Sequence, residues 1–311
     1  MIDPKLEAAL AARHAGAKFE CGLDGDSSRV TVRDDNGVVT RYVVVPLAAG
    51  AERADELDRT ARIVRSGLFR SLPAGVASGA SEVVTVPDGS HLLLALDLPR
   101  AGDAALDAEA ARLVLVALAR LHAAFAGFPA RLTSGLGLLP LGQWLARNRP
   151  SPAVATPVGA GWRAFAARLP DAWAVVGPLL ANPAPLVDAL RECQPTIVQG
   201  NPAPAELSFG DDTVIFHDWE TVTRGPGALD LGAFVAAMWP VGDLGIAGCV
   251  EAYRIEREGL GRLPSDGERW EREVALGLLA GVLRHGWAIA ERSESLDEWD
   301  AVVAAGLAAL D

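Results

Sequence analysis

Lysine is nearly absent from this sequence of 311 residues. Only Lys5 and Lys18 occur, so any mechanism that needs a lysine side chain beyond residue 18 is excluded. Acidic residues outnumber basic ones, and the formal net charge is −12. This charge argues against a nucleic-acid-binding surface and against attraction to anionic lipid. An acidic cleft could attract a cationic ligand, but an acidic surface more often only keeps a protein in solution.

Cysteine is also scarce. The three cysteines, Cys21, Cys193 and Cys249, are widely spaced and odd in number. This pattern is typical of a reducing cytoplasm and not of a disulfide framework or a metal site. The N-terminal segment is charged and lacks the apolar core of a signal peptide. No uninterrupted apolar run is long enough to span a bilayer, so we expect a cytoplasmic protein that does not enter a membrane.

The first hundred residues read as strands around one helix. Residues 28–33 and 38–45 are β-branched runs joined by Asn36-Gly37, which predicts a hairpin. Residues 52–68 form a charged, amphipathic pattern that predicts a helix. Two further strands are expected at 81–86 and 91–96. Half of the chain is hydrophobic and its length is enough for two lobes with cores of their own.

The composition changes after a segment rich in Pro and Gly at 99–103, which we interpret as a hinge. Beyond it the chain is mostly helical, and Leu115, Leu118 and Leu121 recur at helical spacing. A strand, a turn and a second strand at 195–220 interrupt the helices, which resume near Leu231. The sequence thus predicts an N-lobe at 1–98, a hinge at 99–103 and a C-lobe at 104–311, with a ligand cleft between the lobes.

Three local motifs occur in an order that resembles the aminoglycoside phosphotransferase and choline kinase family. ALARLHAAFAG (117–127) looks like the family's helix after the hinge. QGNPAPAE (199–206) stands where the family has its catalytic loop, H-G-D-x-x-x-x-N. HDWE (217–220), followed by GPGALDLGAF (225–234), resembles the family's metal motif. The resemblance covers nearly the whole chain. It implies an α+β, bilobal, protein-kinase-like fold, with a small antiparallel-sheet N-lobe and a larger helical C-lobe that carries the catalytic-loop hairpin and the metal motif (195–232).

The resemblance places substituted residues at the catalytic positions. In the family, the loop Asp accepts the substrate's proton, the loop Asn helps to hold magnesium, and the Asp of the next strand is the main magnesium ligand. Here the base position is Asn201, the Asn position is Glu206, and the metal Asp is kept as Asp218. Gln199 replaces the leading His. An amide cannot accept a proton at neutral pH, so Asn201 can orient a hydroxyl but cannot be a general base.

The nucleotide side is altered as well. The N-lobe lysine that would hold the phosphates of ATP should fall near Val44 or Val45, and it is missing. Its usual glutamate partner is expected at Glu56. The phosphate-covering loop would be 22–28, although two glycines three residues apart are a weak signal. The nucleotide contacts that the resemblance implies are Gly22, Gly25, Ser27, Glu56, Leu96 and Leu98.

Each candidate also has an ordinary structural interpretation. Asp218 could cap a turn, and Asn201 before Pro202 is a favoured turn dipeptide. Glu206 could be a solvated loop residue or a carboxylate ligand of magnesium shared with Asp218. We expect Gln199 to brace the loop, and Asp230 resembles the family's structural Asp that supports the loop from behind.

Other side chains have ordinary interpretations too. His122 should pack on its helix, and Arg224 should be a surface charge. Arg29 and Arg41 could replace the lysine, but exposed strand arginines are common. The tryptophans Trp144, Trp162 and Trp173 should pack in the core.

Three hypotheses follow for function. The first is a pseudokinase-like protein that binds a nucleotide or small molecule, or acts on a protein partner, with little or no phosphoryl transfer. The second is an active ATP- and magnesium-dependent phosphotransferase for a hydroxyl of a small molecule or peptide, in which an arginine covers the phosphates. The third is rerouted chemistry such as nucleotidyl transfer. Losing the base costs about 10² to 10⁴ in rate, and losing the lysine removes charge neutralisation on which phosphoryl transfer relies more. The first hypothesis is therefore favoured.

Overall fold

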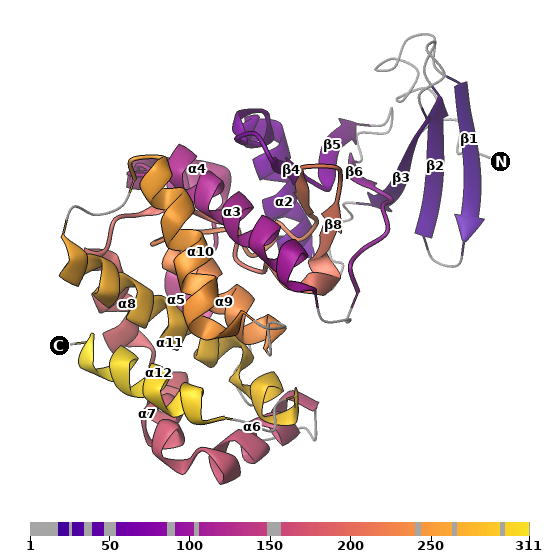
Figure 1. Cartoon of the computed structure of the whole chain (residues 1–311). Coiled ribbons are helices and arrows are strands. Elements are labelled where there is room, and N and C mark those ends of the chain that lie inside the picture. Colours follow the sequence, from indigo (N-terminus) through magenta and orange to yellow (C-terminus); the bar gives the residue numbers. More distant parts are fainter. Residues whose placement is uncertain are drawn as a thin grey trace.

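The computed structural model of this chain describes residues 18–24, 27–33, 39–46, 54–85, 91–102, 106–147, 157–239, 244–262, 266–292 and 296–310. Within them the strands of the N-terminal part lie on one side of the molecule and most helices on the other (Figure 1). This is the α+β arrangement that the sequence predicts, with a small antiparallel sheet before a larger helical part.

The N-lobe is built on a five-stranded antiparallel sheet with the order β1-β2-β3-β6-β5. Alternate residues of these strands face one side, and five of them form a separate small core: Val30, Val32, Val44, Val84 and Leu94. Helix α2 packs against β5. The predicted Asn36-Gly37 turn lies outside the described residues. The elements are β1 (Lys18–Asp24), β2 (Ser27–Arg33), β3 (Val39–Pro46), α2 (Ala54–Ser66), β5 (Ala80–Thr85) and β6 (His91–Leu96).

A short strand that the sequence did not reveal ties the two lobes together. β4 (Val76–Ser78) pairs in parallel with β9 (Val214–Phe216), which itself pairs with β8 (Leu207–Phe209). Main-chain hydrogen bonds continue this pairing, because Gly79 N donates to Phe216 O at 2.7 Å. Residues 76–78 therefore lie inside the predicted N-lobe range but belong to a sheet of the C-lobe.

The strand arrangement between 195 and 220 also differs from the simple hairpin that the sequence suggested. β7 (Thr196–Val198) pairs with β10 (Thr223–Gly225) and not with the strand that follows it. The actual hairpin is β8–β9, closed by a turn at 210–212 in which Gly210 N donates to Thr213 O at 2.8 Å. Residues 199–206 therefore form a loop that crosses from one small sheet to another.

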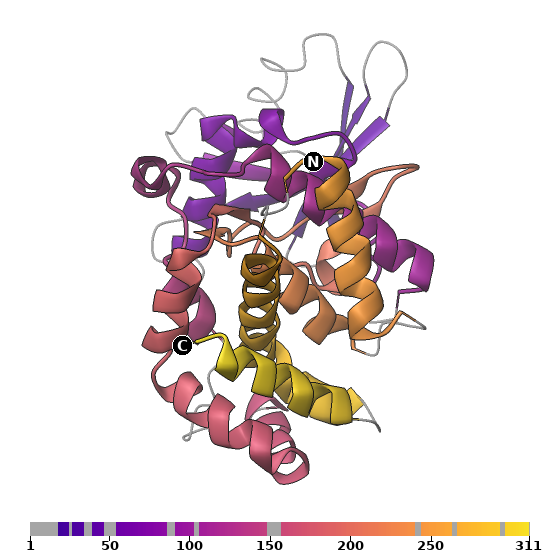
Figure 2. The same ribbon diagram turned by 60° about the vertical axis from the view of Figure 1, so that its left-hand side comes forward.

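The C-lobe is organised around two buried helices, α9 (Ala228–Met238) and α11 (Gly267–Arg292). Their main chains touch at glycines: a Cβ added to Gly232 would lie 1.9 Å from Gly277 O. Gly281 approaches Gly232 just as closely, since its added Cβ would lie 2.1 Å from Gly232 O. α11 runs through the middle of the helical lobe (Figure 2). Only glycine permits this contact, so the two helices are held at a fixed separation.

The remaining helices cover this pair. α3 (Ala108–Ala124) begins at Asp107, whose side chain accepts from Ala110 N at 2.8 Å and caps the helix. It buries Leu115, Leu118 and Leu121, as their spacing predicted. The other helices are α4 (Thr133–Leu136), α5 (Leu141–Ala146), α6 (Pro157–Arg168), α7 (Pro170–Ala181), α8 (Ala184–Glu192), α10 (Gly245–Gly259) and α12 (Asp297–Ala308), with short 3-10 turns at 68–71, 130–132 and 204–206.

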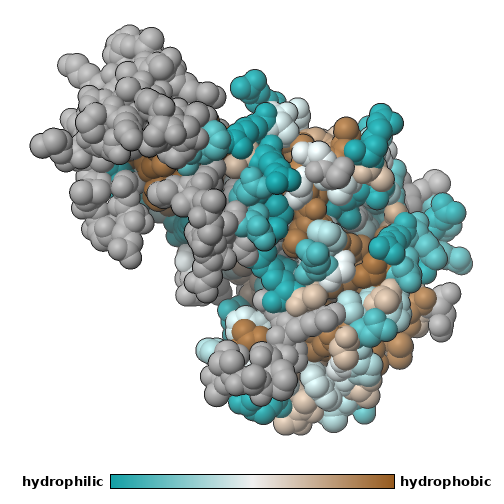
Figure 3. Space-filling model, turned by 180° about the vertical axis from the view of Figure 1, so that it is seen from behind, coloured by the Kyte–Doolittle hydropathy of each residue, from teal (hydrophilic) through white to brown (hydrophobic). Residues whose placement is uncertain are grey.

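Within the part of the chain that the structure describes, one helix could cross a membrane by length and composition alone. It is α11, and 89% of its most apolar window is buried inside the protein, as in a core helix. The bent pair α7 and α8 also passes this criterion when it is taken as one span. On the face seen in Figure 3, hydrophilic residues are spread over the described surface with apolar ones between them. Large exposed apolar side chains such as Leu113 and Ile255 are scattered, which is ordinary for a folded protein.

Candidate functional site

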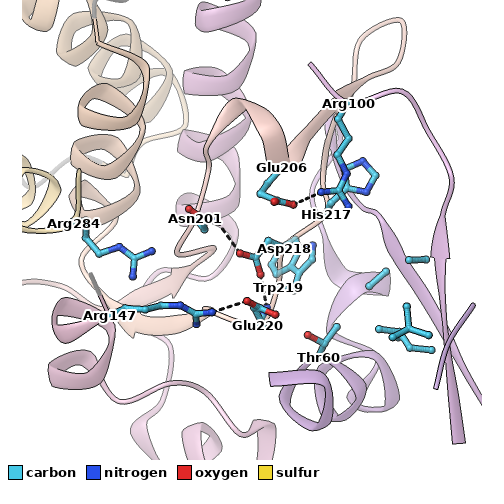
Figure 4. Close-up of a pocket in the computed structure, with 14 residues that line it drawn as sticks. Thr60, Arg100, Arg147, Asn201, Glu206, His217, Asp218, Trp219, Glu220 and Arg284 are labelled. Carbon is cyan, nitrogen blue, oxygen red and sulfur yellow. Dashed lines mark hydrogen bonds and ion pairs between the residues drawn. The ribbon is translucent and has the colours of Figure 1, made fainter. Parts of the chain in front are cut away.

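A pocket of about 370 Å³ lies between the two lobes (Figure 4). Its N-lobe wall is largely apolar: Val45, Ala80, Leu93 and Ala95 come from the sheet, and Thr60 of α2 adds one polar residue. Successive strand residues point to opposite faces, so Val44 is buried in the N-lobe core while Val45 lines the pocket. Of the two positions where the sequence places the missing lysine, Val45 is the one that faces the cleft.

Two of the predicted site residues meet at the floor of this pocket. Asn201 Nδ2 donates to Asp218 Oδ2 at 2.8 Å, and the main-chain N of Glu220 donates to Asp218 Oδ1 at 3.0 Å. A carboxylate only accepts hydrogen bonds, so the amide nitrogen of Asn201 must face it. The second bond closes a local turn, which is the capping role expected of Asp after a strand. Asp218 is therefore both a turn cap and a carboxylate that lines the pocket.

Glu206 is bound to a residue that the sequence analysis did not single out. Its Oε2 lies 2.7 Å from Nη1 of Arg100, which also donates to Ala205 O at 3.2 Å. In Figure 4 the carboxylate is directed toward this arginine. Among the described residues, no group of three or more His, Cys, Asp or Glu side chains could hold a metal ion. Sharing of magnesium by Glu206 and Asp218 therefore stays a prediction.

The loop is held from behind by a buried network around Asp230. Its Oδ2 accepts from Gln199 N and its Oδ1 from Gly200 N, each at 2.7 Å. His122 Nε2 lies 2.9 Å from the same carboxylate, and His122 Nδ1 lies 2.7 Å from the hydroxyl of Tyr253. Burial lowers the pKa of His122 although Asp230 opposes this shift. A neutral imidazole that donates through Nε2 and accepts through Nδ1 satisfies every partner.

The conformation of Gly200 fixes the path of the loop. Its φ is +96°, and an added Cβ would lie 2.3 Å from Thr221 O, so only glycine fits. Its carbonyl accepts from Trp144 Nε1 and from Arg284 Nη2, both at 3.0 Å. The side chain of Gln199 adds a further brace, because its Oε1 accepts from Asn201 N at 2.8 Å and its Nε2 donates to Asp218 O.

No family model matches this chain, and no curated protein matches it. Solved structures do. An aminoglycoside phosphotransferase from Alicyclobacillus acidocaldarius is 14% identical with a TM-score of 0.50, and the match covers 100% of this chain and 95% of that one. The GDP complex of wild-type aminoglycoside 2'-phosphotransferase-IIIa is 13% identical with a TM-score of 0.51, covering 99% of this chain and 97% of that one. This chain has the aminoglycoside phosphotransferase fold. The bilobal, kinase-like architecture that the sequence implied is thereby confirmed.

In this phosphotransferase fold, the predicted nucleotide contacts have mixed outcomes. Gly22 lies within β1, paired with Arg29, and Ser27 begins β2, so the described residues 22–24 and 27–28 belong to two paired strands. Gly25 and the side chain of Glu56 lie outside the described residues. Leu96 ends β6, where its N donates to Gly79 O at 2.7 Å, and Leu98 follows it with its side chain exposed. Neither leucine is among the described residues that line the pocket.

The two arginines considered as substitutes for the lysine lie elsewhere. Arg29 forms an ion pair with Asp97 at 2.9 Å, and the carbonyl of Arg41 accepts from Asp97 N at 2.9 Å. Neither is among the described residues that line the pocket. Arg224 is half-buried and donates to Phe128 O at 2.8 Å, so it is not a free surface charge. Trp144 and Trp162 are buried in the core, as predicted, and Trp173 packs against that core.

Besides Arg100, sequence reasoning missed three charged or polar groups of the pocket. Arg147 follows α5 and lies 2.6 Å from Glu220 Oε1, while Arg284 comes from α11 and is only 2% exposed. His217 Nε2 lies 2.7 Å from Ser208 Oγ. Burial, followed by the charge of Arg100, lowers the pKa of His217 to about 4. Glu220 belongs to the HDWE motif and offered a signal, but the arginines come from helices whose local patterns are ordinary.

Proposed function

We propose that this protein is pseudokinase-like: it binds a nucleoside phosphate with magnesium in the interlobe pocket and transfers the phosphoryl group slowly or not at all. The observation that carries the proposal is the bond from Asn201 Nδ2 to Asp218 Oδ2, at 2.8 Å. It places an amide where the resemblance expects a general base. This amide nitrogen is a donor and cannot take up a proton from an acceptor hydroxyl.

The missing lysine strengthens this proposal. Phosphoryl transfer depends mainly on positioning and on neutralising charge on the transferred group, and Val45 offers no charge at the pocket's roof. Arg100 and Arg147 line the pocket, but each forms an ion pair with a glutamate, at 2.7 and 2.6 Å. Both belong to segments other than the strand that carries Val45, so neither stands in the place of the missing lysine.

Binding of a nucleotide is supported by the fold and by Asp218. One protein with this fold is described as a GDP complex. Asp218 lines the pocket, and a carboxylate oxygen is the ligand type that magnesium prefers. Asp218 would hold the metal, and Glu206 could join it only by leaving Arg100. The metal would supply charge neutralisation for the phosphates. Asn201 would hold the carboxylate of Asp218 in place, and Gln199 would hold its main-chain carbonyl.

A thermal-shift titration with ATP and GTP, each with and without magnesium, tests the binding half of the proposal. At a hundredfold excess over the dissociation constant we expect about 2.7 kcal/mol of stabilisation. Asp218→Asn should remove the magnesium-dependent part and keep the fold. No stabilisation by any nucleotide would refute nucleotide binding.

An ADP-release assay with a panel of hydroxyl acceptors tests the catalytic half. We expect no acceptor-dependent ADP formation in the wild type. The triple variant Val45→Lys, Asn201→Asp, Glu206→Asn returns the three missing groups, and we expect it to gain activity that Asp218→Asn removes. Acceptor-dependent turnover by the wild type would instead establish an active phosphotransferase. Mass spectrometry of the products separates added phosphate from an added nucleotide, which would indicate nucleotidyl transfer.

A further inference from the structure

Arginine side chains lie at both ends of the pocket. Arg147 and Arg284 lie on the C-lobe side of Asp218, whereas Arg100 and Glu206 lie on the other side, next to the hinge (Figure 4). The two arginines come from different elements, since Arg147 directly follows α5 and Arg284 belongs to α11. The fold therefore brings two guanidinium groups to one wall of a cavity.

Arg284 is held in one orientation. Its Nη1 donates to Trp144 O and its Nη2 to Gly200 O, both at 3.0 Å, and its guanidinium carbon lies 4.5 Å from the centre of the Trp144 ring. Only 2% of the residue is exposed. A guanidinium that is already ordered and stacked loses little further freedom when it binds a ligand.

The positive charges of Arg147 and Arg284 repel each other. Burial is the main reason why the pKa of Arg284 is lowered, to about 10, and the charge of Arg147 is the next cause. Asp218 and Asp230 act in the opposite direction without cancelling the shift. Arg284 thus stays charged at neutral pH in a place that disfavours its charge. An anion bound against both guanidinium groups would relieve this cost.

The position of this wall indicates which ligand would carry the anion. If a nucleotide binds with its phosphates near Asp218, as we propose, its base would take the hinge side, where the resemblance places the contacts Leu96 and Leu98. The arginine end then lies beyond Asp218, among side chains of α5 and α11, where the second ligand would sit. This step alone rests on the proposed function.

We infer that Arg147 and Arg284 form an anion subsite, which recognises a phosphate or carboxylate group on the second ligand of the pocket. A second ligand that presents only positive charge would be disfavoured there. Arg147 would turn part of its guanidinium from Glu220 to the anion, and Arg284 would supply fixed donors. The subsite thus selects an acidic small molecule or an acidic peptide side chain.

Calorimetry with inorganic phosphate at low salt, in the presence of saturating adenosine, tests this subsite. Phosphate should bind the wild type, and Arg147→Gln should weaken it by about tenfold or more, since a charged hydrogen bond is lost. Arg284→Lys keeps a cation but loses the fork and should also weaken binding. Arg120→Gln is the matched control. Arg120 Nε lies 2.7 Å from Glu256 Oε1, and neither residue lines the pocket, so its loss should leave phosphate affinity unchanged.

The outcomes separate this inference from the proposed function. Equal phosphate affinity in the wild type, Arg147→Gln and Arg284→Lys would overturn the subsite. Full displacement of phosphate by ADP, but not by AMP, would assign the arginines to the nucleotide's own phosphates and overturn the acceptor-side assignment. Failure of every nucleotide to bind would refute the proposed function while leaving an arginine-dependent phosphate site in place. Succinate as a second probe tells a carboxylate site from a phosphate site, and tight binding of either supports the inference.

Discussion

The two sides of the loop at 199–206 differ in how closely their residues follow the family that the sequence resembles. Behind it, Asp230 accepts from two loop amides and from His122, and every member of this network is fully or nearly fully buried. In front of it, the resemblance expects an aspartate where Asn201 stands and an asparagine where Glu206 stands. Val45 lines the pocket where a lysine is expected. The shape of the loop is thus set by main-chain bonds from behind, so its pocket-facing side chains can change without altering its path.

The replaced side chains are not left without partners. Asn201 bonds to Asp218 and Glu206 to Arg100, and beside them Glu220 of the retained HDWE motif pairs with Arg147. Each polar group that lost its expected role has found a neighbour inside the protein. The two replaced side chains are therefore engaged within the protein, which differs from a pair of reactive groups that wait for substrate.

Removing the anchor behind the loop should have the largest effect. Asp230→Asn would leave buried donors of Gln199, Gly200 and His122 short of acceptors, and we expect the free energy of unfolding to fall by about 3–5 kcal/mol. Urea unfolding measures this loss. Asp188→Asn is the control, because the pair of Asp188 with Arg191 is exposed and should be worth less than about 0.5 kcal/mol. Similar small losses in both variants would mean that the network does not hold the loop.

Low pH should produce the next largest loss of folding stability. Burial, and then the charges of Arg284 and Arg292, lower the pKa of His285 on α11 from 6.5 to about 3. Below pH 6.5 the unfolded chain takes up a proton that the folded chain refuses, so stability falls as the pH drops toward 3. His285→Leu should remove up to about 3 kcal/mol of this loss at pH 4. Urea titrations from pH 4 to 8 test it: the two curves should run parallel above pH 7 and diverge below 6.5, and curves parallel throughout would contradict it.

A substitution that strains the loop's backbone should cause a stability loss of intermediate size. Gly200→Ala places a Cβ against Thr221 O in a residue whose φ is +96°, and we expect a loss of about 2–3 kcal/mol. Gly102→Ala is the matched control, because Gly102 has a φ of +74° and nothing lies within 4 Å of its added Cβ. It should lose only the conformational part, about 1 kcal/mol. Equal losses would show that contact with Thr221 is unimportant.

A substitution on the pocket side should cost least. Asn201→Asp puts a second carboxylate beside Asp218 and should destabilise the protein by about 1–2 kcal/mol at neutral pH. Repulsion raises the pKa of one member of the pair, so the deficit is absent in acid and grows as the pH rises through that raised pKa. Millimolar magnesium should remove the deficit by binding between the carboxylates. Chemical unfolding at several pH values, with and without magnesium, measures it; a deficit independent of pH would mean that the two side chains do not meet.

Local patterns predicted those helices and strands whose own sequence is enough to determine their conformation. The hydrophobic spacing of Leu115, Leu118 and Leu121 marks the buried face of α3, and the β-branched runs mark β2 and β3. The pairing of β7 with β10, and of β4 with β9, could not be predicted in the same way. These strands have three residues each, so tertiary contacts and not local propensity choose their partners.

Only those residues of the candidate site that belong to the motifs QGNPAPAE and HDWE could be predicted from the sequence. The meeting of Asn201 with Asp218 follows from the order of QGNPAPAE and HDWE in the family that the sequence resembles. Arg100, Arg147 and Arg284 had no such signal, because an arginine in a hinge or on a helix is ordinary until the fold brings it to a cavity. Glu206 was considered as a magnesium ligand, and its ion pair with Arg100 depends on a hinge residue 106 positions away.

The glycine contact between α9 and α11 has a consequence for the pocket. Asp230 lies two residues before Gly232, and Arg284 lies three residues after Gly281, so one rigid seam positions both the loop's anchor and a cation of the cavity. A single methyl group at that seam would push the two helices apart and displace both groups together. The geometry of the pocket is therefore set partly by residues that do not line it.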